Sequence, residues 1–93
     1  DNSDILVPRA FSPNTDGHND KLDIFLVGVK KMNYFRIFNR WGQLLFSTSK
    51  LHVGWDGTLG GVQQPGGTYV WMIEGLTKDN RVITKKGAVT LIR

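Results

Sequence analysis

The 93-residue sequence has no cysteine, only three prolines and no long run of apolar residues. Without cysteine, no disulfide can support the thin core of so short a chain. No segment approaches the roughly 18–20 apolar residues of a transmembrane helix, and apolar residues at helical spacing are nearly absent. The sequence therefore predicts a single domain over residues 1–93 that is built from strands.

Charge and side-chain chemistry exclude two further classes of protein. The formal net charge is only +4, and the lysines form short pairs, Lys30-Lys31 and Lys85-Lys86, instead of the basic stripe of a nucleic-acid-binding protein. The only imidazoles are His18 and His52, and no serine lies in the strained turn that activates a nucleophile. We therefore expect neither nucleic-acid binding, nor enzyme activity, nor a small-molecule substrate.

Alternation of polar and apolar residues predicts short strands separated by Gly, Pro, Asn and Asp turns. These include a polar turn at residues 78–81 and a break at Gly87 before the final strand. The segment 68–73 is apolar on both faces, which predicts a central place in a sheet. Residues 1–6 are expected to form a linker or an edge strand. The predicted strands cover residues 5–7, 21–27, 34–38, 44–47, 68–73, 82–84 and 88–92. This pattern predicts an all-β fold, an immunoglobulin-like antiparallel β-sandwich of about seven strands.

One loop has the spacing of a calcium site. Its candidate ligands alternate around Gly17, as oxygen ligands do in calcium loops, and they are Asn14, Asp16, His18 (through its carbonyl) and Asp20. The alternative is a cluster of Asx turns in which the side chains cap their own backbone. The sequence leaves both interpretations open, with one Ca²⁺ as the only cofactor considered.

Two turns carry a tryptophan beside a glycine, in Asn39-Arg40-Trp41-Gly42 and in Trp55-Asp56-Gly57. Exposed tryptophans stack on sugar rings, so these residues, together with Trp71, could form a carbohydrate platform. Alternatively, aromatic residues at the corners of a sandwich cover the ends of its core, and an acid before glycine bonds the backbone of its turn. We favour this structural interpretation for both turns.

Five motifs in order resemble the gliding-motility-associated C-terminal domain, the type B sorting domain of the type IX secretion system in Bacteroidota. The motifs lie at residues 11–20, 37–42, 55–57, 65–71 and 87–93. The resemblance extends from about Val7 to Arg93, nearly the whole chain. The final Leu91-Ile92-Arg93 is similar to the native C-terminus of that family, so we expect the chain to end where its parent protein ends.

The resemblance implies a non-catalytic sorting signal at the C-terminus of a larger cargo protein, which is secreted or held at the cell surface. The implied partners are the type IX machinery and a PorP/SprF-like outer-membrane protein. Because an edge strand can be extended by a partner's strand, we expect recognition at the last strand and its neighbours. These candidate residues are Lys85, Lys86, Val89, Thr90, Leu91, Ile92 and Arg93. We also expect Val89, Leu91 or both to face the core. The alternative function is a carbohydrate- or protein-binding accessory module of a surface adhesin.

Overall fold

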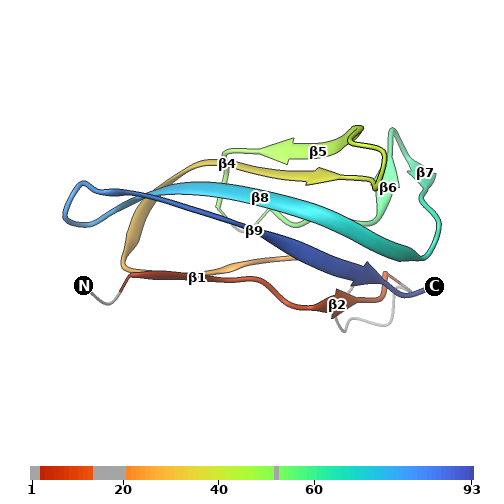
Figure 1. The fold of residues 1–93 in the computed structure, drawn as a ribbon, viewed down its shortest axis with the longest axis horizontal. Coiled ribbons are helices and arrows are strands. Elements are labelled where there is room, and N and C mark those ends of the chain that lie inside the picture. The colour runs from red at the N-terminus through yellow and green to blue at the C-terminus, as the bar shows by residue number, and fades with distance from the viewer. Residues whose placement is uncertain (1–2, 14–20, 52) are drawn as a thin grey trace.

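The structure, a computed structural model, describes residues 3–13, 21–51 and 53–93. These residues form an all-β fold with nine strands (Figure 1). The strands are β1 (Asp4–Leu6), β2 (Ala10–Phe11), β3 (Phe25–Val27), β4 (Val29–Phe38), β5 (Leu44–Thr48), β6 (Thr58–Leu59), β7 (Val62–Gln63), β8 (Gly67–Thr77) and β9 (Val82–Leu91). Among the described residues there is no helix of the length and hydropathy that crossing a membrane requires.

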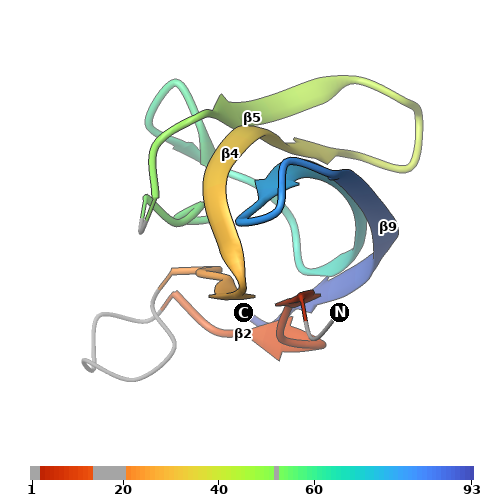
Figure 2. The ribbon, with the colours of Figure 1, turned by 90° about the vertical axis from the view of Figure 1, so that its left-hand side faces the viewer.

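The strands form two layers of a sandwich. The larger layer is a five-stranded sheet in the order β2-β9-β8-β4-β5, and the smaller layer is the antiparallel pair β1-β3. Figure 2 shows the large sheet curving from β5 at the top of the view to β2 at the bottom. A small hairpin, β6-β7, forms inside the glycine-rich connection between β5 and β8. The arrangement confirms the predicted sandwich-like fold.

The opening segment divides into two strands that belong to different sheets. β1 pairs antiparallel with β3, where Ile5 lies opposite Leu26, and β2 pairs parallel with β9, where Phe11 lies opposite Leu91. Pro8 stands between them and has no backbone N–H to donate to a ladder, so the pairing breaks there. The chain thereby joins the two layers along one edge of the sandwich.

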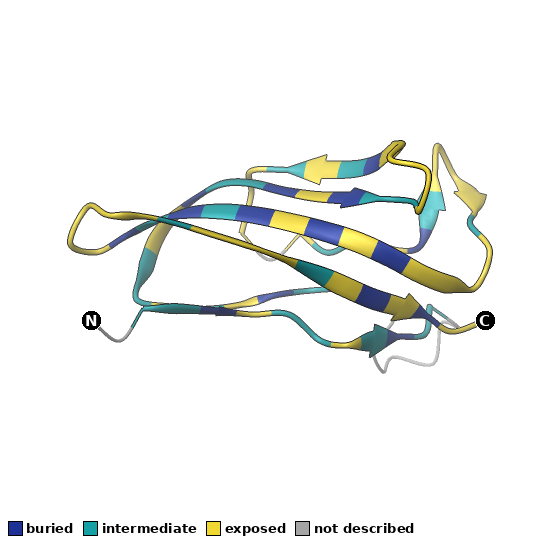
Figure 3. Cartoon of the chain, in the orientation of Figure 1, coloured by how far each residue is buried: buried dark blue, intermediate teal, exposed yellow. Residues whose placement is uncertain are grey.

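The central strand is β8, as the sequence predicts. It pairs with β4 on one side and with β9 on the other. Tyr69, Trp71 and Ile73 are buried on its inner face, whereas Val70 and Met72 alternate with them on the exposed outer face (Figure 3). The apolar residues on both faces therefore reflect a central position within one sheet, with the outer face of β8 left open to solvent.

The predicted break at Gly87 is wrong, because β9 is continuous through this residue. Gly87 pairs with Trp71 on β8, and a Cβ atom on Gly87 would lie 2.7 Å from Cζ2 of the Trp71 ring. The glycine therefore serves close packing inside a strand and does not form a turn. Residues 82–91 belong to one ladder, which makes β9 as long as β4, and the predicted final strand 88–92 ends one residue earlier, at Leu91.

The core lies between the layers, with Trp55 at its centre. Trp55 is completely buried, and its ring centroid lies 5.6 Å from that of Phe11 and 5.1 Å from that of Tyr69. Its backbone N–H donates to the carbonyl of Leu22, and Leu22 N–H donates back to Trp55. The other buried apolar residues are Ile5, Ile24, Met32, Phe35, Ile37, Leu45, Trp71, Ile73, Val89 and Leu91.

Candidate recognition surface

The C-terminal half of β9 has one face in the core and one in solvent. Val89 and Leu91 are both 1% exposed, which confirms that they face the core, whereas Thr90 and Ile92 are exposed. The residues of the predicted set whose side chains a partner can reach are Lys85, Lys86, Thr90, Ile92 and Arg93. We call these five residues the C-terminal surface.

The backbone of β9 has an open edge over much of its length. β8 pairs with one edge along the whole strand, whereas on the other edge β2 pairs only with Thr90 and Leu91. There the N–H of Thr90 donates to Arg9 (2.8 Å) and that of Ile92 donates to Phe11 (2.9 Å). Because backbone groups alternate sides along a strand, those of Thr84, Lys86 and Ala88 point to the same edge as those of Thr90. No described strand pairs with them.

The two lysines of β9 differ in their contacts. The Lys85 ammonium donates to Oδ1 of Asp4 (2.5 Å) and to the carbonyl of Ile5 (3.2 Å), so it holds β1 beside β9. This hydrogen bond, together with one from the Ile5 N–H, lowers the pKa of Asp4 below its usual range. Lys86 is exposed and lies opposite Met72 on the outer face of the sheet, where it makes no ion pair with a described residue.

Arg93 joins the C-terminus to the glycine-rich connection. Its Nε donates to the carbonyl of Gln64 (2.9 Å), and its Nη2 donates to that of Gly57 (2.8 Å). Gly57 has a φ of 82°, and a Cβ there would approach Cγ of Pro13 to 3.1 Å, so this position requires glycine. Burial raises the pKa of Tyr69, and the positive charge of Arg93 opposes that shift. Arg93 is therefore exposed to a partner and also holds the C-terminus against the glycine-rich connection.

The turn that contains Trp55 confirms the structural interpretation. The indole Nε1 donates to the carbonyl of Thr58 (2.9 Å). Oδ1 of Asp56 accepts from the N–H of Thr58 (3.0 Å) and from its hydroxyl (2.7 Å). Asp56 thus bonds the backbone of its own turn, as expected, while Trp55 fills the core.

The same interpretation is wrong for Trp41, which is 77% exposed. Its turn joins β4 to β5, and β5 is the edge strand of the large sheet. The ring therefore projects from the end of an edge hairpin and is not covered by a second layer of described residues. Oδ1 of Asn39 still holds the turn, because it accepts from the N–H of Trp41 (2.9 Å) and of Gln43 (3.0 Å).

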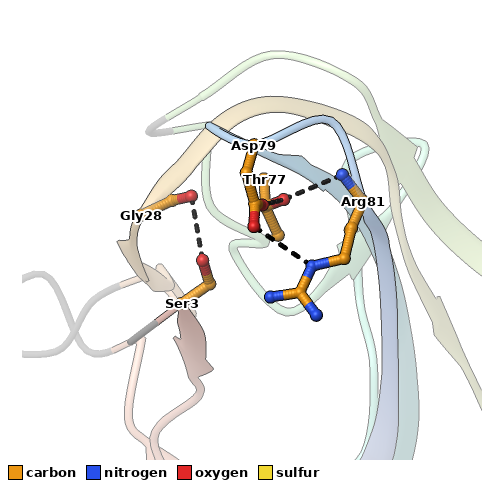
Figure 4. Close-up of polar contacts among 5 residues, drawn as sticks. All are labelled: Ser3, Gly28, Thr77, Asp79 and Arg81. Carbon is orange, nitrogen blue, oxygen red and sulfur yellow. Dashed lines mark hydrogen bonds and ion pairs between the residues drawn. The ribbon is translucent and has the colours of Figure 1, made fainter. Parts of the chain in front are cut away.

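The turn between β8 and β9 is polar, as predicted, and its side chains form hydrogen bonds with one another and with the turn's backbone (Figure 4). The buried hydroxyl of Thr77 donates to Asp79 and accepts from the N–H of Arg81 (2.9 Å), and Asp79 Oδ2 accepts from Arg81 Nε (3.1 Å). The hydrogen bond from Thr77 is the main cause that lowers the pKa of Asp79, and the charge of Arg81 adds to it. In the same view, Ser3 Oγ donates to the carbonyl of Gly28.

The predicted calcium loop, with Asn14, Asp16, His18 and Asp20, lies outside the described residues, as does His52. Within residues 3–13, 21–51 and 53–93, no cluster of three or more His, Cys, Asp or Glu side chains is arranged to hold a metal ion. The calcium site therefore stays a prediction.

The fold and these surfaces define a class of protein, a small immunoglobulin-like β-domain whose polar side chains support its turns and strand edges. The sequence matches the model of the CHU_C family, the type IX secretion signal domain, over residues 5–91. The chain belongs to this family. No curated protein and no solved structure matches it.

Family membership makes the domain a sorting signal of type IX secretion. It is part of a larger cargo protein, interacts with the secretion machinery and directs secretion across the outer membrane. The family is non-catalytic, which agrees with the expectation that the chain is not an enzyme. The expected resemblance is thus confirmed at the level of the secretion signal.

Two features of the surface were missed in the sequence. The open edge at Thr84, Lys86 and Ala88 has no local signal, because it depends on which strands pair with β9, and Gly87 suggested a turn within this stretch. The exposure of Trp41 has no local signal, because its turn carries the same kinds of residues as the buried Trp55 turn.

Proposed function

We propose that this domain directs its cargo through the type IX system of a Bacteroidota cell by presenting the C-terminal surface to the machinery. The proposed partner is a PorP/SprF-like outer-membrane protein, and the same contact retains the cargo at the cell surface, in a gliding-motility or adhesion context. The observation that supports this proposal most is the open edge of β9, which adjoins the C-terminal surface.

An open edge is a template onto which a partner's strand can add through main-chain hydrogen bonds. Two copies of β9 that paired antiparallel about Lys86 would bring like charges together, and this destabilises such a pair. Lysine on an edge strand is one way in which proteins prevent self-association. The edge therefore favours a different chain over a second copy of this one.

The proposal is tested by fusing the domain to the C-terminus of a reporter that is not normally exported. We expect the fusion to reach the cell surface or the medium of a type IX-competent cell and to stay inside a cell that lacks the machinery. Export in both cells, or in neither, would contradict the proposed function.

Recognition by the C-terminal surface is tested most cleanly at Lys86. Charge reversal at Lys85 or Arg93 would also break intramolecular hydrogen bonds, whereas Lys86 makes no ion pair among the described residues. Lys86→Glu should reduce export of the fusion, and the matched control Lys50→Glu, in the exposed bend after β5, should not.

The open edge itself is tested by Ala88→Pro, which removes an outward N–H and leaves the ladder with β8 complete. We expect reduced export at an unchanged melting temperature. If Ala88→Pro and Lys86→Glu are both exported as well as the wild type, recognition does not involve this part of β9.

A further inference from the structure

A groove of about 320 Å³ lies beside the exposed tryptophan, between the β4–β5 turn and the start of β8. Residues 39–41 line one side of it, and residues 64–69 line the other. We call it the tryptophan groove. Its volume is at the lower end of the range for small binding sites. None of the residues that form the C-terminal surface lines it, so it is a separate feature of the molecule.

The tryptophan is held in place although it is exposed. The side-chain oxygen of Asn39 accepts hydrogen bonds from two backbone N–H groups of the turn. The N–H of Gly42 donates to the backbone carbonyl of Asn39 (3.0 Å). Gly42 has a φ of 84°, which a residue with a side chain rarely adopts. A fixed turn loses little conformational entropy when a partner binds, so the exposed ring of Trp41 is preorganised for contact.

The groove is positively charged. Arg40 is the single charged residue among those that line it, and its guanidinium lies 4.8 Å from the centroid of the Trp41 ring. No described carboxylate forms an ion pair with Arg40. The guanidinium is therefore free to bind a carboxylate from another molecule, with the indole beside it to take an apolar group.

The polar groups of the groove favour a protein over a carbohydrate. A sugar needs several free hydrogen-bonding groups around the aromatic ring, but both ends of the Asn39 amide are already bonded within the turn. The hydroxyl of Tyr69 likewise donates to the carbonyl of Pro65. Tryptophan and arginine are the residue types that most often carry the binding energy of protein interfaces.

The groove and the Thr90, Ile92 and Arg93 part of the C-terminal surface lie at the same end of the molecule, whereas Lys85 and Lys86 pair with the middle of β8. Gly67 pairs with Leu91 and Thr68 pairs with Thr90, and Gly66 lies against the carbonyl of Leu91 and the side chain of Arg93. Figure 1 shows the C-terminus, the start of β8 and the β4–β5 turn together at the right of the view. One partner can therefore contact both features.

From these observations we infer that the tryptophan groove anchors a protein partner through a segment that presents an acidic side chain next to an apolar one. The carboxylate binds Arg40, and the apolar group packs on Trp41. This inference rests on the proposed function, because the partner is a component of the secretion machinery that also contacts the C-terminal surface.

The test uses the reporter fusion with Trp41→Ala and, separately, Arg40→Glu, expressed in type IX-competent cells. Loss of an interface anchor lowers affinity by about tenfold or more, so we expect the exported fraction to fall by about tenfold in each variant. The matched controls are Phe25→Ala, which removes an aromatic ring that is 65% exposed on β3, and Lys50→Glu. Export of both controls should stay within about twofold of the wild type.

The melting temperature of each purified fusion distinguishes a loss of recognition from a loss of folding. Trp41→Ala and Arg40→Glu should have the melting temperature of the wild type, because both side chains are exposed. If the wild-type fusion itself is not exported, the proposed function fails. If the wild type and both groove variants are exported equally, this inference alone fails. Binding of the fusion to soluble glucan, xylan or chitosan that is lost in Trp41→Ala would overturn the protein partner and indicate a carbohydrate site.

Discussion

The turns around Trp41 and Trp55 have the same local chemistry and different surroundings. In each turn, a side-chain oxygen accepts a hydrogen bond from the backbone N–H two residues later. Asn39 accepts from Trp41, and Asp56 accepts from Thr58. Trp55 also exchanges backbone hydrogen bonds with Leu22 and is completely buried, whereas Trp41 lies at the tip of an edge hairpin. The turn chemistry fixes the backbone, and the second layer of the sandwich decides whether the ring supports the core or remains available to a partner.

The largest expected difference between the two turns is in stability. Trp55→Ala removes a fully buried ring and should lower the free energy of unfolding by about 3–5 kcal/mol, which is a large share of the stability of a small domain. Trp41→Ala should change it by less than about 0.5 kcal/mol. Urea denaturation of both variants measures the difference, and equal destabilisation would contradict the assigned roles.

The third tryptophan provides an intermediate case, because Trp71 packs against a glycine of the neighbouring strand. Gly87→Ala places a Cβ 2.7 Å from the Trp71 ring and should cost about 1–3 kcal/mol through overpacking. Trp71→Phe removes the nearest ring atoms, so the double variant should be more stable than the sum of the two single changes predicts. Strict additivity in urea denaturation would show that the ring and Gly87 are not in contact.

A smaller and nearly equal effect is expected from the turn oxygens themselves. Each side-chain oxygen accepts two hydrogen bonds within its turn, and the Asn39 amide also donates one to the exposed side chain of Gln43. Asn39→Ala and Asp56→Ala should each cost about 1 kcal/mol. Similar losses, measured by thermal unfolding, would support the view that local turn chemistry is shared. A large loss in Asp56→Ala alone would instead mean that this acid supports the core together with Trp55.

The smallest expected effect concerns the opposite end of the sandwich, where Asp79 lies in the closed polar turn shown in Figure 4. The hydrogen bond from Thr77 holds the folded pKa of Asp79 below the unfolded value of about 3.9. The ionised carboxylate therefore stabilises the fold above that value, and the contribution is lost as the pH falls through the folded pKa. The melting temperature of Asp79→Asn should be slightly lower than that of the wild type at pH 7, and the two melting temperatures should converge in acid. If the two melting temperatures differed by the same amount at every pH, the ionisation of Asp79 would not contribute to stability.

Those parts of the molecule that depend on local pattern could be predicted from the sequence. Alternation predicts parts of β1, β3, β4, β5, β8 and β9 and the burial of Val89 and Leu91, and the apolar residues on both faces of β8 predict its central position. Composition predicts the polar turn at residues 78–81. The short strands β2, β6 and β7 were not predicted, and the predicted strand 21–27 is wrong for residues 21–24, because only Phe25–Val27 pair in a ladder. Contacts between distant segments could not be predicted in this way. Gly87 resembles a turn residue until the ring of Trp71, 16 positions earlier, is placed beside it.

The candidate site shows the same division between local and long-range information. The sequence identifies the last strand as exposed on one face, but it does not show that β2 closes the edge at Thr90 and Leu91 and leaves the preceding residues open. Nor does it show that the hairpin of Trp41 projects from the sandwich, because this depends on β5 being an edge strand. Both features are set by the order of strands in the sheet.

Export of the reporter fusion, compared between type IX-competent cells and cells that lack the machinery, tests most directly whether this domain is a sorting signal. We expect machinery-dependent export of the wild type, and a marked loss of export in Trp41→Ala and Lys86→Glu while the melting temperatures remain unchanged. Retention of the wild-type fusion inside competent cells, or export without the machinery, would contradict the proposed function.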